Sequence, residues 1–288
     1  MTIEPRLNST GVTRGNVCLL LVVLATVFVQ ACSAIQPADT SGPRTNQPIY
    51  PALIAIDPAR QEATLAAIKQ ALPENWQNLN IKLHPITGTI QGGAIDWPFF
   101  LPKIGTQAAM NEEETRESLR RFIAERRNLI GAEPDQLSLI EHTDQPDGSK
   151  LARYEQRPFR FTLRGQFGKL EIRFAADRRV IGLDSTCIPD AERIQPTLAS
   201  ITPVLKPEDA VKYVSENGVT YTDTNGQQQT VRPPPTSVNA RELVFYVLPS
   251  TSQPNALEFH LAWAVDLTDA PLKTVYVDAV ESRIIATG

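Results

Sequence analysis

The order of apolar and polar residues predicts a capped helix in the first half of the chain. Apolar side chains between Leu119 and Ile130 recur at the spacing of one helix face. Asn111 precedes them as an N-cap, and Glu114 three residues later completes a capping-box pattern. Gly131 follows the last apolar position, where a glycine ends many helices. The pattern therefore predicts a helix that begins at Asn111 and ends at Gly131.

Proline and glycine mark two shorter helices. Asp57 followed by Pro58 is a typical helix start, because proline fits the first helical position, and Pro73 stops the apolar run that follows. Pro207 opens another amphipathic stretch, which Gly218 ends. Both stretches are long enough for two or three turns, so we expect each to pack one face against a sheet.

Alternating residues predict antiparallel strands in two regions of the chain. Residues 169–174 alternate cleanly and continue through a turn into 180–183, which is the pattern of a hairpin with one buried face. Three further strands are predicted within residues 243–248, 257–267 and 274–285, and the first of them is apolar on both faces, as in a central strand. Helices followed by such a meander predict an α+β fold, with helices packed on antiparallel sheets.

The first thirty residues predict export. Arg6 and Arg14 precede the apolar run Val17–Val29, which has the length of a signal-peptide core and falls short of the roughly 20 apolar residues that span a bilayer. Cys32 follows Ala31 directly. This arrangement resembles the lipobox of bacterial lipoproteins, in which cleavage before the cysteine leaves that residue to carry acyl chains. A plain secretory signal cut near Ala34 is the alternative.

The lipoprotein interpretation divides the N-terminal region into two parts. Residues 1–31 would be a signal peptide, and residues 32–50 a polar, flexible tether between the lipid and the folded body. Several acyl chains on Cys32 would hold the protein stably on a membrane. Ser33 after the cysteine resembles the pattern that sorts lipoproteins to the outer membrane of cells with two membranes.

The net charge argues against one class of partner, and the cysteine content argues against disulfide bonds. The chain carries a net charge of −4, and because residues 1–31 contribute +1, the remainder carries −5. No block of Lys and Arg stands out, which argues against a nucleic acid as partner. Cys187 is the one cysteine beyond Cys32, so no disulfide can staple the fold, and we expect Cys187 to be a small buried apolar residue.

The sequence contains few of the residues and motifs that enzymes commonly use for catalysis. His84, His142 and His260 lie far apart in the sequence, and no H-E-x-x-H, paired cysteines, phosphate-binding glycine loop or G-x-S-x-G is present. We expect His142 in a turn and His260 in the exposed register of its strand, with Trp263 on the buried side. A Ser–His–Asp or Cys187–His arrangement assembled in space stays open. We therefore expect no catalytic residue, metal or cofactor.

The spacing of several short motifs resembles the propeptide (FTP) domain of fungalysin/thermolysin-type metallopeptidases. The motifs are, in order, the helix residues 119–123, then 129–131, 154–156, 169–174, 180–183, 188–190 and 206–210. The part from Leu243, with residues 261–265 and 277–279, resembles the PepSY unit that follows in those propeptides. The resemblance implies an FTP-like domain over residues 51–200 and a PepSY-like, cystatin-like helix-plus-sheet domain over residues 201–288.

The resemblance implies a role for the protein without implying a reaction. Family propeptides help the attached peptidase to fold and keep it inactive, and the sequence ends at Gly288, where the family continues into the peptidase. Two details depart from the family pattern: Glu281-Ser282 stands where Thr-Gly is usual, and the turn at Asp177 lacks its glycine. We expect an inhibitor or folding helper of a secreted thermolysin-like zinc peptidase. An envelope binding module with the same fold, and an enzyme, are the alternatives.

Overall fold

Antiparallel sheets with helices against them make up the folded part of the chain. The computed structural model describes residues 49–71, 81–94, 98–106, 110–268 and 270–288, and residues 48–288 form one compact unit. The predicted signal peptide, Cys32 and the predicted tether up to residue 48 lie outside the described residues. The α+β class predicted from the sequence is confirmed.

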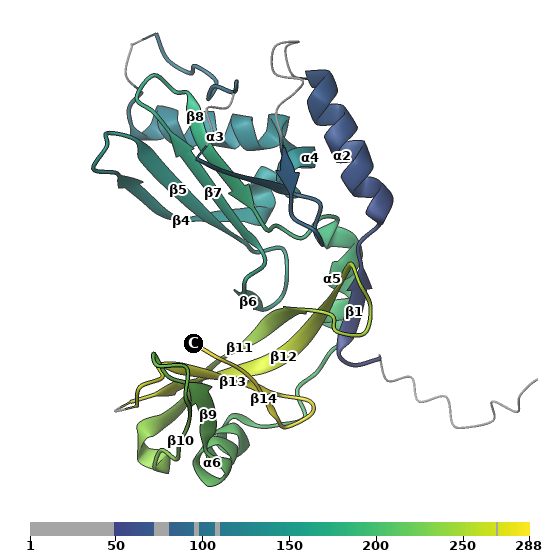
Figure 1. The fold of residues 1–288 in the computed structure, drawn as a ribbon, viewed down its shortest axis with the longest axis vertical. Helices are drawn as coiled ribbons and strands as arrows, with labels where there is room; N and C mark the ends of the chain where they lie inside the picture. The colour runs from purple at the N-terminus through teal and green to yellow at the C-terminus, as the bar shows by residue number, and fades with distance from the viewer. Residues whose placement is uncertain (1–48, 72–80, 95–97, 107–109, 269) are drawn as a thin grey trace, which may run out of the picture. The chain divides into compact units, whose positions relative to one another are not determined.

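One sheet is entirely antiparallel and has strand order β2-β3-β8-β7-β5-β4 (Figure 1). Its strands are β2 (Lys82–Leu83), β3 (Ile90–Ala94), β4 (Leu137–Asp144), β5 (Lys150–Gln156), β7 (Lys169–Phe174) and β8 (Val180–Ser185). The predicted hairpin is the β7–β8 pair, in which Leu170, Ile172 and Phe174 are buried and the residues between them are more exposed. Alternation therefore identified the buried face of this sheet.

Helices α2 (Pro58–Ala71), α3 (Glu112–Glu125) and α4 (Arg127–Ile130) pack on this sheet. The predicted capping box at the start of α3 is confirmed, because the Asn111 side chain accepts a hydrogen bond from the Glu114 backbone N–H, and the Glu114 carboxylate accepts one from the Asn111 N–H. The backbone leaves the helical conformation at Arg126, where φ is −111° and ψ is 17°, so the single helix predicted up to Gly131 is two helices.

Gly131 ends α4 for a steric reason as well as a conformational one. Its φ of 84° lies in the left-handed region that L side chains rarely adopt. A Cβ at this position would lie 2.5 Å from the Cγ2 atom of Thr89, which is closer than real Cβ atoms approach a neighbour. The two helices bury one face against the sheet, with the side chains Leu119, Phe122, Ile123 and Ile130.

The second sheet has the path β14-β13-β12-β11-β6, with β1 paired to β12 (Figure 1). Its strands are β1 (Ala52–Ala55), β6 (Thr162–Gly165), β11 (Val238–Pro249), β12 (Ala256–Leu267), β13 (Thr274–Asp278) and β14 (Ile284–Thr287). The predicted strands from residue 243 onward are confirmed, and β11 is central. Strand β6 runs parallel to β11, whereas the other pairs are antiparallel. Thus β1, at the start of the folded unit, and β6, just past the middle of the chain, pair with strands from the last quarter.

Two helices pack on the buried face of the second sheet. Helix α5 (Ala191–Ala199) contributes Ile194 and Leu198 to a cluster with Phe245 and Phe259. Helix α6 (Pro207–Asn217) contributes Ala210 and Val214 to the neighbouring cluster around Val265 and Val277. The predicted start and stop of α6 are confirmed. The remaining short elements are β9 (Val219–Thr222), β10 (Gln228–Val231) and the 3₁₀ turns η2 (Pro134–Gln136) and η3 (Pro235–Ser237).

Candidate functional site

The three histidines lie in separate places. His84 precedes a turn, and its Nδ1 accepts hydrogen bonds from the backbone N–H groups of Ile86 and Thr87. Burial lowers the pKa of His84, so its ring favours the neutral form that accepts these bonds. His142 and His260 belong to β4 and β12. The structure therefore does not bring the histidines together.

His260 is buried, so its predicted exposed register is wrong. Its side chain is 1% exposed, and its Nδ1 atom lies 2.8 Å from Oδ2 of Asp278 on the neighbouring strand β13. The sequence prediction assumed that only one face of β12 is covered. On the other face, however, Tyr246 and Tyr276 pack over the small side chains of Ala262 and Ala264.

Asp278 joins His260 to the N-terminal end of the folded unit. Its carboxylate accepts a 2.8 Å hydrogen bond from the Tyr50 hydroxyl and two backbone hydrogen bonds, from Val280 and Glu281. Burial by itself would raise the pKa of Asp278, but these bonds and the one with His260 lower it below its usual range. Burial and the Asp278 carboxylate both raise the pKa of Tyr50. The group therefore holds an ionised carboxylate beside a neutral phenol.

The hydrogen bonds around Asp278 hold Tyr50 against two strands of the second sheet. Tyr50, the last residue of the predicted tether, also accepts a 3.0 Å hydrogen bond from the Leu261 N–H through its hydroxyl. A carboxylate that orients a histidine also occurs in catalytic triads. Here, however, both His260 and Asp278 have almost no exposed surface on which a substrate could act. We therefore interpret the group as a structural one that holds Tyr50, just before β1, against strands β12 and β13.

Cys187 is fully buried, as predicted. Burial raises the pKa of its thiol to about 12. The thiolate is the reactive form of cysteine, so at neutral pH this side chain is held in its unreactive form. Its position in the core around Ile130 and Leu170 makes it a packing residue.

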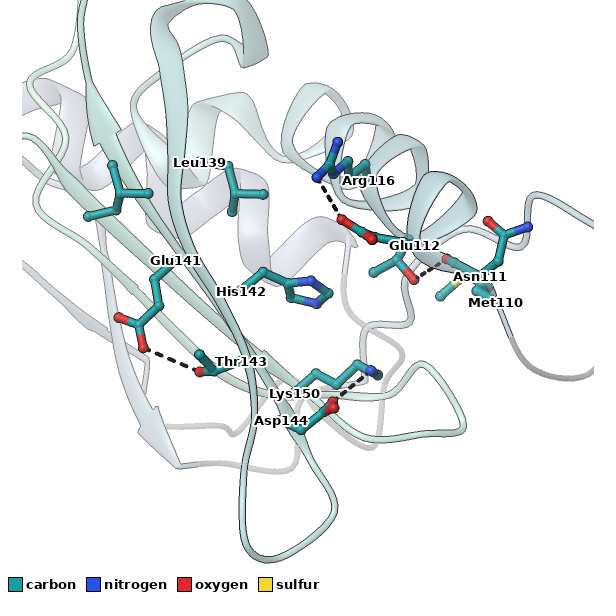
Figure 2. A pocket seen from close by; sticks show the side chains of 12 residues that line it. Met110, Asn111, Glu112, Arg116, Leu139, Glu141, His142, Thr143, Asp144 and Lys150 are labelled. Atoms are coloured by element: carbon teal, nitrogen blue, oxygen red, sulfur yellow. Dashed lines mark hydrogen bonds and ion pairs between the residues drawn. The ribbon is translucent and has the colours of Figure 1, made fainter.

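A hollow between α3 and the edge of the first sheet brings polar side chains together (Figure 2). It has a volume of about 530 Å³, and Glu112, Arg116, His142 and Lys150 are among the residues that line it. His142 lies in β4, so its predicted turn position is wrong. Its ring stacks on Phe174, and no hydrogen-bond partner for its Nε2 is present among the described residues.

A β-bulge explains which side chains of β4 face this hollow. The register with β5 shifts between Leu139 and Glu141, which leaves Ile140 as an extra residue. Leu139 and His142, three positions apart, therefore point to the same side of the strand, toward α3, as Figure 2 shows. Alternation in the sequence would place them on opposite sides, which is why the sequence did not reveal this site.

Ion pairs occupy most charged groups at the hollow. Arg116 contacts Glu112 at 2.6 Å, and Lys150 contacts Asp144 at 2.7 Å. These groups are exposed, so their pairing adds little stability, and they stay available to an incoming ligand. Within the described parts of the chain, no group of three or more His, Cys, Asp or Glu side chains is placed to hold a metal ion.

Among the described helices, none is both long enough and apolar enough to cross a membrane. Comparison with known protein families finds no family model that matches the chain, and comparison with curated proteins finds no relative.

Proposed function

We propose that this chain is a membrane-anchored, non-catalytic lipoprotein that binds a secreted thermolysin-like zinc peptidase and inhibits it or helps it to fold. Cys32 would carry the lipid anchor. The motifs that resemble FTP and PepSY propeptide units support the proposal. In this view, residues 51–200 are the FTP-like unit and residues 201–288 the PepSY-like unit.

Two residues of those motifs make buried hydrogen bonds within the fold. The Gln156 side chain donates a 2.9 Å hydrogen bond to the Ile188 carbonyl and accepts a 2.8 Å bond from the Ile188 N–H, and all of these groups are buried. Asp278, from another motif, makes the buried contacts with His260 and Tyr50. Because these side chains stabilise the fold, recognition of a partner would fall to the surface around them.

The observation that carries the proposal is the open edge of β4. This strand pairs with β5 on one side and ends the order of its sheet, and no strand of the described residues pairs with its other edge. Such an edge can accept an extended segment of another protein, with main-chain hydrogen bonds supplying affinity. The hollow beside α3 lies along the same strand. Protein binding is thus the activity that this geometry supports best.

The second candidate is an envelope binding module that uses the same edge for another protein. Affinity capture distinguishes the two, with the full-length chain purified in detergent as bait and envelope extract of its own host as the source. Enrichment of a peptidase that contains H-E-x-x-H supports the first proposal. Reproducible enrichment of envelope-assembly proteins without such a peptidase would replace it with the second.

A further inference from the structure

The hollow beside His142 is one of three that adjoin. A second hollow of about 410 Å³ shares Arg116 and Leu139 with it. A third, of about 520 Å³, shares Arg120 and Pro134 with the second. Since each hollow shares lining residues with the next, the three adjoin in a row beside α3 and the start of β4. We call the middle one the α3–β4 groove; it is lined by Arg116, Arg120, Ile123, Leu137, Leu139 and Tyr154.

The floor of the α3–β4 groove is apolar. Ile123 and Tyr154 are buried core residues at the bottom of the groove, and burial raises the pKa of Tyr154, so its ring stays neutral. Leu137 and Leu139 pack against the same core and are only half-buried. Ile140, the extra residue of the bulge, is 49% exposed beside them. An apolar side chain of a partner would therefore find apolar contacts along this floor.

Two arginines stand at the rim of the α3–β4 groove. Arg116 and Arg120 are the ionisable groups with long side chains at its border, and both are 59% exposed. Each has a carboxylate of its own helix as partner, Glu112 for Arg116 and Glu117 for Arg120. Exposed pairs of this kind contribute little, so either guanidinium can rotate to a carboxylate of a bound chain. Guanidinium groups also bind carboxylates through two parallel hydrogen bonds.

We propose that the α3–β4 groove binds an extended segment of a partner protein in which apolar residues alternate with acidic ones. The apolar side chains lie on Leu137 and Leu139, which are partly exposed, and the carboxylates contact Arg116 and Arg120. The backbone of the segment runs along the open edge of β4. This inference rests on the proposed protein-binding function and assigns it a surface and a partner chemistry.

Three synthetic peptides of eight residues, blocked at both ends and carrying a fluorophore, test this chemistry. One alternates Glu with Val, one Lys with Val, and one Glu with Ser. Fluorescence anisotropy measures their binding to the full-length chain in detergent. We expect the Glu–Val peptide to bind at least tenfold more tightly than either of the others. Equal binding of the Lys–Val peptide, or no binding of the Glu–Val peptide at millimolar concentration, would overturn the inference.

Matched variants locate the binding surface. Replacing both Arg116 and Arg120 by Ala should weaken Glu–Val binding at least tenfold. Arg121→Ala should leave it unchanged, because Arg121 is a similarly exposed arginine that pairs with Glu117 but is absent from the groove lining. Far-UV circular dichroism checks that each variant is folded. An equal loss of binding in Arg121→Ala would mean that general positive charge, and not this groove, attracts the peptide.

Two further outcomes test the groove and the proposed function independently of each other. If the peptide results hold but no peptidase responds to the protein, the groove stands and the peptidase proposal fails. If a peptidase is inhibited equally by the parent chain and by the Arg116→Ala, Arg120→Ala variant, the groove is wrong and the function stands. A dimer in sedimentation that Ile140→Glu abolishes would identify the occupant as a second copy and also overturn the inference.

Discussion

Nδ1 of His260 lies 2.8 Å from Oδ2 of Asp278, and the two side chains come from neighbouring strands of the second sheet. The carboxylate also binds the hydroxyl of Tyr50, which lies 228 positions earlier in the chain. Both ends of the folded unit therefore meet at one buried anion. We expect this group to act on stability, and its members can be tested one at a time.

Asp278→Ala should lower the free energy of unfolding. It leaves several buried donors without an acceptor, and each unsatisfied buried group costs about 1–3 kcal/mol. Urea denaturation measures the effect, with Glu281→Ala as the control because Glu281 lies in the same turn and pairs with the exposed Arg283. Because the pKa of Asp278 is lowered, its contribution should be present at neutral pH and fade as the pH falls below the ordinary value of 3.8. Equal midpoints for the two variants would contradict this role.

Tyr50 should make stability sensitive to alkali. The raised pKa of Tyr50 means that the folded chain keeps the proton after an unfolded chain has lost it at its ordinary value of 10.0. Its contribution is therefore complete below pH 10 and declines above it. The gap in urea midpoint between the parent chain and Tyr50→Phe should narrow between pH 10 and pH 11. A gap that stays constant over this range would show that Tyr50 is not held as a neutral donor.

Trp263 should contribute to the packing of the second sheet. Its ring contacts both core clusters of that sheet, and its Nε1 donates a 2.9 Å hydrogen bond to the Leu205 carbonyl. Truncation of a buried Trp to Ala costs about 3–5 kcal/mol, and because Trp263 is only partly buried we expect the lower end. Trp263→Phe should cost less, since a ring remains. Denaturation midpoints of the two variants check this order, and an unchanged midpoint for Trp263→Ala would refute it.

Cys32→Ala should abolish lipid attachment. The lipoprotein interpretation depends on this cysteine, because acylation requires its thiol. Cells that express the parent chain and the variant are labelled with an alkyne fatty acid, and the protein is then captured and its label quantified. Cys187→Ala serves as the matched control and should keep the label, because Cys187 is buried in the fold. Equal label on the Cys32→Ala protein would show that Cys32 is not the acylated residue, and a parent chain without label would leave the plain secretory interpretation.

Local signals in the sequence were sufficient for most elements. The capping box at Asn111, the stop at Gly218 and the alternation of β7 depend on residues within one turn or one strand, and each is confirmed. The pairing of β1 with β12 and of β6 with β11 joins segments far apart in the chain. Nothing in either segment alone indicates its partner strand.

The candidate sites could not be predicted from the sequence, because they depend on a β-bulge and on packing between elements, which the spacing of apolar residues does not reveal. A bulge at Ile140 turned His142 toward α3, and a single extra residue of this kind leaves the apolar pattern unchanged. His260 is buried on the second face of its sheet, where the Tyr50 ring packs edge-on against it, and Tyr246 and Tyr276 pack against Ala262 and Ala264 on the same face. The lining of the α3–β4 groove likewise joins a helix to a strand that the sequence did not place beside it.

Hydrolysis by zinc peptidases of the same host tests the central claim most directly. The full-length chain, purified in detergent, is mixed at micromolar concentration with each secreted thermolysin-like peptidase, and both substrate cleavage and refolding yield are followed. We predict that at least one peptidase is inhibited or refolds in higher yield, and that the protein alone cleaves nothing, with or without zinc. If no peptidase changes in either measurement, or if the protein alone cleaves the substrate, the proposed function is wrong.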